Sequence, residues 1–272
     1  MRRAPAPAKL NLALVVGARR DDGKHEVATV LQRLDLSDRV AVAPAPGLTV
    51  TGFPEDTIVR QALLELARVA GVAPRWRATI AKRIPVAAGL GGGSSDAATA
   101  LRLANETLDR PLATTDLQAL AASLGADVPF FLVDGPQLGR GDGSELTALE
   151  LPQDYWVLLV LPGGSAKEST AAVYRSFHER DGAAGAAERF VALEGALAGI
   201  RRPRDLAALP PNDLASSPLA GELRELGAFR ADVSGAGPVV YGLFHHRQAA
   251  ERARRELVSK GRVWLTVPVW YG

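Results

Sequence analysis

The amino-acid sequence predicts an α+β fold, in which strands and helices follow one another in an irregular order. Residues 7–16 alternate their side chains with the period of two that is typical of a strand. Residues 56–70 instead carry apolar side chains at helical intervals, and Gly71 is expected to end that helix. Since no regular β–α–β repeat joins such segments, a doubly wound parallel sheet is not expected.

The other segments extend this irregular order. Strands are predicted at residues 26–34, 39–43, 76–82, 155–161, 228–233, 238–244 and 262–269. Helices are predicted from the end of a glycine-rich loop to about residue 108, and over residues 114–124, 168–200 and 247–260, with a break at 181–185. The turn at residues 151–154 marks a predicted boundary, which divides residues 1–152 from residues 153–272.

Composition excludes several kinds of protein. The 272 residues include no cysteine, which rules out disulfide scaffolds, thiolate zinc sites and cysteine nucleophiles. The 32 Lys+Arg and 30 Asp+Glu residues leave a formal charge of +2, so nucleic acid is not an expected partner. Because the sequence shows no signal peptide and no apolar run of about 18 residues, we expect a cytoplasmic protein without a membrane partner.

The strongest local signal is the glycine-rich loop at residues 85–95, Pro-Val-Ala-Ala-Gly-Leu-Gly-Gly-Gly-Ser-Ser. Successive glycines permit positive φ and allow backbone amides to approach a ligand. The helix expected after the loop adds unpaired N–H groups and the positive end of its dipole. The loop has neither the Gly-Lys-[Ser/Thr] ending of a P-loop nor dinucleotide-binding glycine spacing. It therefore predicts a different kind of phosphate site; a flexible turn before an alanine-rich helix is the alternative.

This loop resembles the second conserved motif of the GHMP kinases, a family that includes galactokinase, homoserine kinase and mevalonate kinase. Other segments resemble motifs of the same family, in the same order along the chain: residues 6–14 with 19–26, 125–131, 211–214 and 234–238. The resemblance implies a two-domain GHMP kinase fold, with a ribosomal protein S5 domain 2-like N-terminal domain and a ferredoxin-like C-terminal domain. The form of the loop is similar to that of members whose acceptor carries a cytidine diphosphate group.

The resemblance implies an ATP site along the loop. The residues expected to bind ATP phosphates are Pro85, Ala88, Gly89, Leu90, Gly91, Gly92, Gly93, Ser94 and Ser95. Lys82, just before the loop, is a further candidate for a phosphate contact, with a surface lysine at a strand end as the alternative. Thr57 stands where relatives often have an asparagine that contacts adenine. We expect Mg²⁺ to arrive with ATP and to be bound by its phosphates, Ser95 and water, since no carboxylate cluster suggests a dedicated metal site.

Asp127 is the candidate catalytic base. A carboxylate in an apolar stretch needs a partner, and phosphoryl transfer needs a group that accepts the hydroxyl proton. Lys9 is its expected partner, on the same face of the first strand as Asn11. The resemblance implies the same pairing of Lys9 and Asp127. A structural aspartate in a turn and a surface lysine on an edge strand are the alternatives.

The acceptor site is predicted mainly from the same resemblance. His25 would donate a hydrogen bond to cytosine. Tyr174 would stack on the cytosine ring or pack in a core. Lys24 departs from the family, which usually has a stacking aromatic residue immediately before the histidine; the lysine ammonium could bind a phosphate or the base instead.

Three further residues complete the predicted acceptor site. Asn11 could hydrogen-bond the acceptor or Asp127, or be a polar residue of an edge strand. Gly235 and Gly237 belong to the third motif, a glycine turn that the resemblance places against the active site.

The sequence therefore predicts an ATP-dependent small-molecule kinase that phosphorylates a hydroxyl group of an acceptor with a cytidine diphosphate group. Two alternatives remain open: another GHMP kinase, acting on homoserine, mevalonate or a sugar, and a non-catalytic protein on the same fold. Either a monomer or a homodimer is compatible with the sequence.

Overall fold

The computed structural model describes residues 1–53, 58–164 and 169–269. The described chain divides into two compact units. The first unit contains residues 1–8, 36–86 and 91–134, and the second contains residues 9–35, 87–90 and 135–272. Both units combine segments that are distant in sequence, and a domain boundary between residues 152 and 153 stays a prediction.

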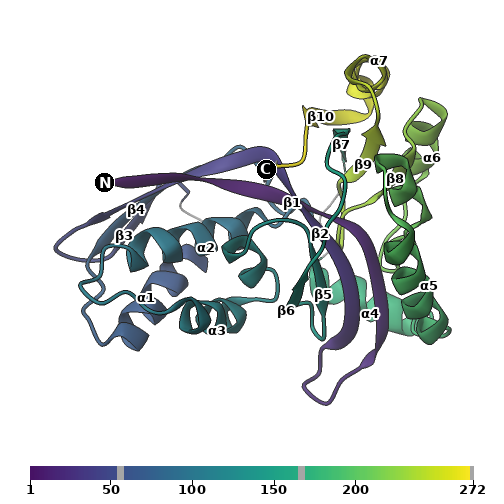
Figure 1. The fold of residues 1–272 in the computed structure, drawn as a ribbon. Helices are drawn as coiled ribbons and strands as arrows, with labels where there is room; N and C mark the ends of the chain where they lie inside the picture. The colour runs from purple at the N-terminus through teal and green to yellow at the C-terminus, as the bar shows by residue number, and fades with distance from the viewer. Residues whose placement is uncertain (54–57, 165–168, 270–272) are drawn as a thin grey trace. The chain divides into compact units, whose positions relative to one another are not determined.

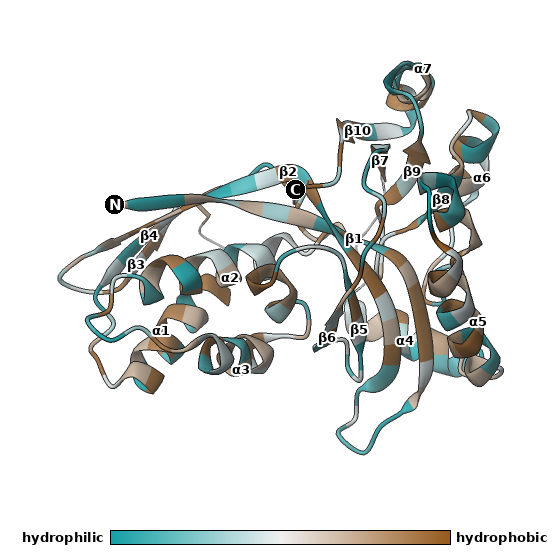
Figure 2. Ribbon diagram, in the orientation of Figure 1, coloured by the Kyte–Doolittle hydropathy of each residue, from teal (hydrophilic) through white to brown (hydrophobic). Residues whose placement is uncertain are grey.

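The two longest strands pair as a hairpin, purple in Figure 1: β1 (Arg2–Arg19) and β2 (His25–Pro44). Figure 2 shows the turn of this hairpin as hydrophilic and much of the strands leading to it as hydrophobic. β2 is one strand where two were predicted, at 26–34 and 39–43. Residues 35–39 interrupt the apolar pattern, but they do not interrupt the backbone pairing that defines a strand.

The first unit places three helices beside a small sheet. In the sheet, β4 (Trp76–Ala81) pairs antiparallel with residues 39–44 of β2 and parallel with β3 (Thr49–Thr51). The helices, which pack against one another, are α1 (Ile58–Ala70), α2 (Gly92–Asn105) and α3 (Thr114–Leu124), and a short 3₁₀ helix, η1 (Pro129–Leu132), contacts α2 and α3.

The prediction for the end of α1 is confirmed. The helix stops at Ala70, and Gly71 follows with a φ of +66°, the left-handed conformation that glycine adopts at low cost. Of the apolar residues whose spacing predicts this helix, Ala62 and Leu66 are buried, together with Val59 and Leu63, whereas Val69 is exposed.

The second unit contains a four-stranded antiparallel sheet with the order β10-β7-β9-β8. Its strands are β7 (Trp156–Pro162), β8 (Arg230–Val233), β9 (Val240–Phe244) and β10 (Gly261–Thr266). Two helices share an apolar core with this sheet, α6 (Pro218–Glu225) and α7 (Arg247–Leu257). The order β7–α6–β8–β9–α7–β10 is the βαββαβ arrangement of ferredoxin-like folds, which confirms this part of the predicted fold.

Further elements of the second unit complete the fold in Figure 1. β5 (Gln137–Arg140) pairs with β2, and β6 (Glu145–Ala148) pairs with β5. Between β7 and α6 lie α4 (Thr170–Glu179), α5 (Ala186–Gly199) and a 3₁₀ helix, η2 (Pro203–Ala208); η3 (Val258–Lys260) follows α7. The break predicted at 181–185 falls between α4 and α5.

Sequence reasoning missed β3, β5, β6 and α6. Each of them is only three to eight residues long. Segments this short show little periodicity, and strands of this length are stabilised mainly by pairing with a partner that the local sequence does not reveal.

None of the helices in the described ranges combines the length and the apolar character needed to cross a membrane.

Candidate functional site

The second-unit part of the glycine-rich loop, residues 87–90, is held by three hydrogen bonds to its carbonyl groups. The Lys9 amide donates to the carbonyl oxygen of Leu90 at 2.9 Å, and Ser234 Oγ donates to that of Gly89 at 3.1 Å. The amide of Val239 donates to the carbonyl oxygen of Ala88 at 3.2 Å. The loop is therefore joined both to β1 and to the chain around the third motif.

Gly89 has no room for a side chain. A Cβ at this position would lie 2.2 Å from the carbonyl oxygen of Ser234 and 3.1 Å from that of Gly237, and its φ is +81°. Backbone passes close to backbone here, which only glycine permits. This contact joins two of the motifs on which the family resemblance rests.

The first-unit part of the loop opens α2. Gly91 is the N-cap, in the left-handed conformation with a φ of +67°, and its carbonyl oxygen accepts from the Ser95 amide at 2.9 Å. α2 begins at Gly92, inside the predicted loop, so the N–H groups of its first turn belong to Gly92, Gly93 and Ser94. Such groups and the helix dipole favour an anion.

Ser95 adds a second polar feature to this helix start. Its side chain is fully buried, and within the described part of the chain its Oγ has no hydrogen-bond partner. A buried hydroxyl without a partner is costly. A ligand that brings an oxygen or a metal ion to Ser95 would therefore recover this lost interaction.

Lys82 lies before the loop and is bound by two carboxylates. Its Nζ forms ion pairs with Asp38 and, at 2.8 Å, with Asp96 in α2; both aspartates are buried. Burial lowers the pKa of Lys82, but Asp96 and Asp38 outweigh this effect, so the pKa is raised. Asp38 also accepts from the amides of Arg83 and Ile84. The ammonium group thus links the end of β4 to α2, and a phosphate contact of Lys82 stays a prediction.

Lys9 and Asn11 lie side by side on β1, as predicted from the strand period. Lys9 Nζ donates to Asn11 Oδ1 at 2.6 Å, and Asn11 Nδ2 donates to Thr29 Oγ1 of β2 at 2.7 Å. Both residues are only 4% exposed, so the alternative of an exposed edge strand is wrong for this position. Thr29 was missed, because the pairing of β2 with β1 is needed to bring it to Asn11.

Asp127 lies partly buried in the turn between α3 and η1. It belongs to the first unit, whereas Lys9 belongs to the second. The pairing of Lys9 with Asp127 stays a prediction.

The third motif forms a glycine turn, residues 234–238, against β1. Ser234 Oγ accepts from the Asn11 amide at 3.4 Å. A Cβ on Gly235 would lie 3.2 Å from Asn11 Oδ1 and 3.6 Å from Lys9 Nζ. Two predicted residues, Asn11 and Gly235, are therefore brought together with the predicted catalytic lysine. Ser234 was not among the predicted site residues, although its hydroxyl joins the two motifs.

His25 and Tyr174 are also brought together. Their rings stack with centroids 5.0 Å apart and an interplanar angle of 29°, and Phe177 meets His25 edge-on at 6.0 Å. Burial lowers the pKa of His25 below its usual value, and His178 and Arg19 lower it further. A neutral imidazole has one donor and one acceptor nitrogen, which suits hydrogen bonding to a nucleobase.

Lys24, where the family usually has an aromatic residue, forms an ion pair with Asp142 in the turn between β5 and β6. Burial raises the pKa of Asp142, but hydrogen bonds from Lys24 and Ser144 outweigh it and bring the pKa to about 2. Lys24 therefore joins the turn between β1 and β2 to the turn between β5 and β6. A role of Lys24 in binding a substrate stays a prediction.

Replacing Lys24 by Met should raise the pKa of Asp142, because the ion pair is lost while the burial remains. A depressed carboxyl pKa stabilises the fold above the unfolded value of about 3.9, and this contribution is lost as the pH falls through the folded value of about 2. We therefore expect Lys24→Met to lower the free energy of unfolding at pH 5 and to converge on the wild type as the pH falls below about 2. Denaturant unfolding across this pH range measures the difference in the free energy of unfolding.

Lys260→Met, which removes the exposed ion pair with Glu222, is the control and should show no such convergence with the wild type. If the free energies of unfolding of Lys24→Met and the wild type instead ran parallel across the pH range, the expectation would be contradicted.

Thr57 lies outside the described residues. Among the residues that are described, no group of three or more histidine or acidic side chains is arranged to hold a metal ion.

Comparisons with known proteins agree on the class of the chain. Residues 57–135 match the family model of the GHMP kinase N-terminal domain, and residues 214–263 match that of the GHMP kinase C-terminal domain. Together with the two-unit α+β fold and its glycine-rich loop, these matches define the chain as a GHMP kinase.

Relatives that match along nearly the whole chain identify a particular family among the GHMP kinases. The chain is 38% identical over 278 residues to the 4-diphosphocytidyl-2-C-methyl-D-erythritol kinase of Citrifermentans bemidjiense, which covers 97% of this chain and 96% of the relative. It is 40% identical to the kinase of the same name from an Anaeromyxobacter species, over 94% of this chain and 86% of the relative. A crystal structure of 4-(cytidine 5'-diphospho)-2C-methyl-D-erythritol kinase matches with a TM-score of 0.80 and 33% identity, over 99% of this chain and 100% of that one. The chain belongs to the family of 4-diphosphocytidyl-2-C-methyl-D-erythritol kinases.

Proposed function

We propose that this chain transfers the γ-phosphoryl group of ATP to the 2-hydroxyl of 4-diphosphocytidyl-2-C-methyl-D-erythritol, a step of non-mevalonate isoprenoid biosynthesis. One structural observation supports it most: three motifs far apart in sequence meet in the second unit. They are the Lys9–Asn11 stretch of β1, the carbonyl groups of Gly89 and Leu90, and the Ser234–Pro238 turn.

The chemistry needs a proton acceptor and a positive charge. The oxygen of the acceptor hydroxyl forms a bond to the γ-phosphorus as the bond from that phosphorus to the β–γ bridging oxygen breaks. ADP leaves with the bridging oxygen, and the hydroxyl proton passes to the carboxylate of Asp127. Lys9 stabilises the negative charge on the transferring group. Its hydrogen bond to Asn11 supports this role, because it fixes the orientation of the ammonium group.

The glycine-rich loop is proposed to bind the phosphates of ATP. The first-turn amides of α2 support this assignment, since they are the kind of donors that phosphate oxygens accept from. Ser95 Oγ fits the predicted role of a magnesium ligand, because it is a buried oxygen without a partner among the described residues. Mg²⁺ bound with the phosphates would neutralise the charge that develops on them.

Cytosine is proposed to bind at His25 and Tyr174. The lowered pKa of His25 supports a neutral ring near pH 7, with a donor nitrogen for the base. Tyr174 is a partly buried aromatic residue next to that ring. Since Lys24 cannot stack, the base would have one aromatic partner where family members usually offer two. We propose that the enzyme acts in the cytoplasm as a monomer or homodimer without a nucleic-acid partner.

An acceptor panel tests the function. ADP release is measured with Mg-ATP and, separately, 4-diphosphocytidyl-2-C-methyl-D-erythritol, homoserine, mevalonate and galactose. We expect ADP release with the first acceptor only. Turnover of another acceptor in its place would assign the chain to a different GHMP activity, and no turnover with any of them would support a non-catalytic protein on this fold.

A further inference from the structure

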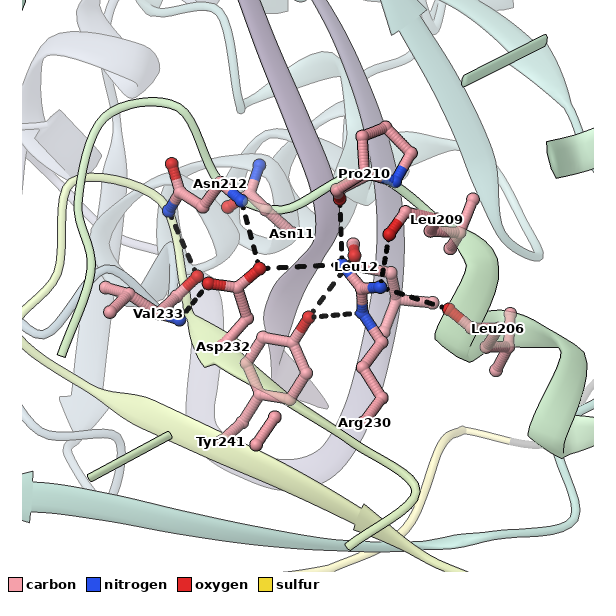
Figure 3. A network of polar contacts seen from close by, with 12 residues as sticks. Asn11, Leu12, Leu206, Leu209, Pro210, Asn212, Arg230, Asp232, Val233 and Tyr241 are labelled. Carbon is pink, nitrogen blue, oxygen red and sulfur yellow. Dashed lines mark hydrogen bonds and ion pairs between the residues drawn. The ribbon is translucent and has the colours of Figure 1, made fainter. Parts of the chain in front are cut away.

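A network of buried polar groups connects Arg230, Asp232, Tyr241 and Asn212, as Figure 3 shows. Its centre is Arg230 on β8, whose guanidinium donates to the carbonyl oxygens of three residues that lead toward Asn212: Leu206, Leu209 and Pro210, at 3.1, 2.6 and 2.9 Å. Arg230 also faces Asp232 at 3.5 Å. Such a buried arrangement is stable only when each group is satisfied, so it holds the segment before Asn212 in one conformation.

Asn212, in the family-like segment of residues 211–214, joins this network to the turn. Its Nδ2 donates to the carbonyl oxygens of Val233 and Gly235, at 3.0 and 2.6 Å. Its Oδ1 accepts from the Leu214 amide at 2.9 Å, and its own amide donates to Asp232 at 2.9 Å. These hydrogen bonds join the buried residue to β8 and to Leu214, and the bond to Gly235 holds the turn itself.

Tyr241, on β9, joins the same network to β1. Its hydroxyl accepts from Arg230 Nε at 3.2 Å and donates to the carbonyl oxygen of Leu12 at 3.3 Å. Leu12 follows Asn11 directly, so this bond fixes the backbone that carries Asn11 and, three residues before Leu12, Lys9. The network thus holds both β1 and the turn, the two segments that meet where a Cβ on Gly235 would lie 3.2 Å from Asn11 Oδ1 and 3.6 Å from Lys9 Nζ.

We propose that Asn212 and Tyr241 are positioning residues for phosphoryl transfer, because they hold the Gly235 turn and β1 in a fixed relation and so fix the side chains of Lys9 and Asn11. The inference rests on the proposed kinase function. A displacement of about 1 Å at a reacting group can cost up to about 10²-fold in rate, so small shifts at this junction matter. Neither residue is proposed to touch the reacting atoms; both act through Lys9 and Asn11.

A pair of Tyr→Phe variants tests the link to β1. Tyr241→Phe removes only the hydroxyl that bonds Arg230 and Leu12, and we expect kcat to fall about fivefold with the KM for ATP nearly unchanged. Tyr155→Phe is the matched control: Tyr155 is also buried, next to β7, but its hydroxyl has no hydrogen-bond partner among the described residues. We expect Tyr155→Phe to keep the wild-type kcat. Equal kcat for Tyr241→Phe and Tyr155→Phe, measured at a temperature where both are folded, overturns the proposal even if their melting temperatures differ.

Asn212→Asp tests the link to the turn. It keeps the shape of the side chain and the acceptor for Leu214, but it removes the two donors to Val233 and Gly235. We expect kcat to fall at least about tenfold, and we expect amides of residues 234–237 to exchange with deuterium at least about tenfold faster, while amides in α7 keep their rates.

The exchange measurement also separates this inference from the proposed function, because it needs no activity. If the wild-type chain phosphorylates no acceptor, the proposed function fails, and the positioning role in phosphoryl transfer fails with it, whatever the exchange rates. If the wild type is active and Asn212→Asp leaves both kcat and the amide exchange of residues 234–237 unchanged, only the inference is overturned.

Discussion

Asp127→Asn should lower turnover at least about 10²-fold while ATP binds with nearly its wild-type affinity. The amide has almost the shape of the carboxylate, so the turn between α3 and η1 should keep its conformation. It cannot accept the hydroxyl proton, however, and the loss of a general base typically costs about 10²–10⁴-fold. Steady-state ADP release measures turnover, and a nucleotide titration measures affinity.

A second aspartate provides the control for this experiment. Asp116 lies exposed in the first turn of α3, shortly before Asp127 in the sequence. Asp116→Asn removes the same charge and should cost at most about 1 kcal/mol of stability, through the helix dipole, without affecting turnover. Wild-type turnover in Asp127→Asn would remove Asp127 from the mechanism.

Gly89→Ala should disrupt the junction of the glycine-rich loop with the third motif. The new methyl group would lie 2.2 Å from the carbonyl oxygen of Ser234, and the φ of +81° is unfavourable for alanine. We expect a loss of about 2–4 kcal/mol in the free energy of unfolding, from backbone strain and overpacking. Because the loop must shift, ATP should also bind at least about tenfold more weakly. Thermal unfolding and a nucleotide titration measure the two effects.

Gly221→Ala is the matched control for this substitution. Gly221 lies within α6, and nothing lies within 4 Å of the Cβ that alanine would add. Alanine should stabilise this helix by up to about 1 kcal/mol and leave ATP affinity as it is. If Gly89→Ala matched the wild type in both stability and affinity, the close backbone approach seen at Gly89 would have no functional importance.

Much of the fold could be predicted because its signals are local. Alternation in residues 7–16 predicts part of β1, helical spacing with Gly71 predicts α1 and its end, and the glycine-rich stretch at 181–185 predicts the break between α4 and α5. These features depend on backbone conformation and on the spacing of apolar side chains within one segment. The extent of β2 could not be predicted in this way, since its partners lie elsewhere in the chain.

The candidate functional site also has features that the local sequence predicts and features that depend on folding. The sequence by itself determined which chemical groups are present: the loop glycines, the lysine and asparagine two residues apart on β1, and an aspartate in an apolar stretch. Family motifs also indicated Asn212, but not what it does. Only the tertiary structure decided that Asn212 holds the Gly235 turn, that Tyr241 bonds to Leu12 and that Lys82 is bound by Asp38 and Asp96. These contacts join residues 14 to 229 positions apart, and hydrogen bonds form only where folding brings a donor to its acceptor.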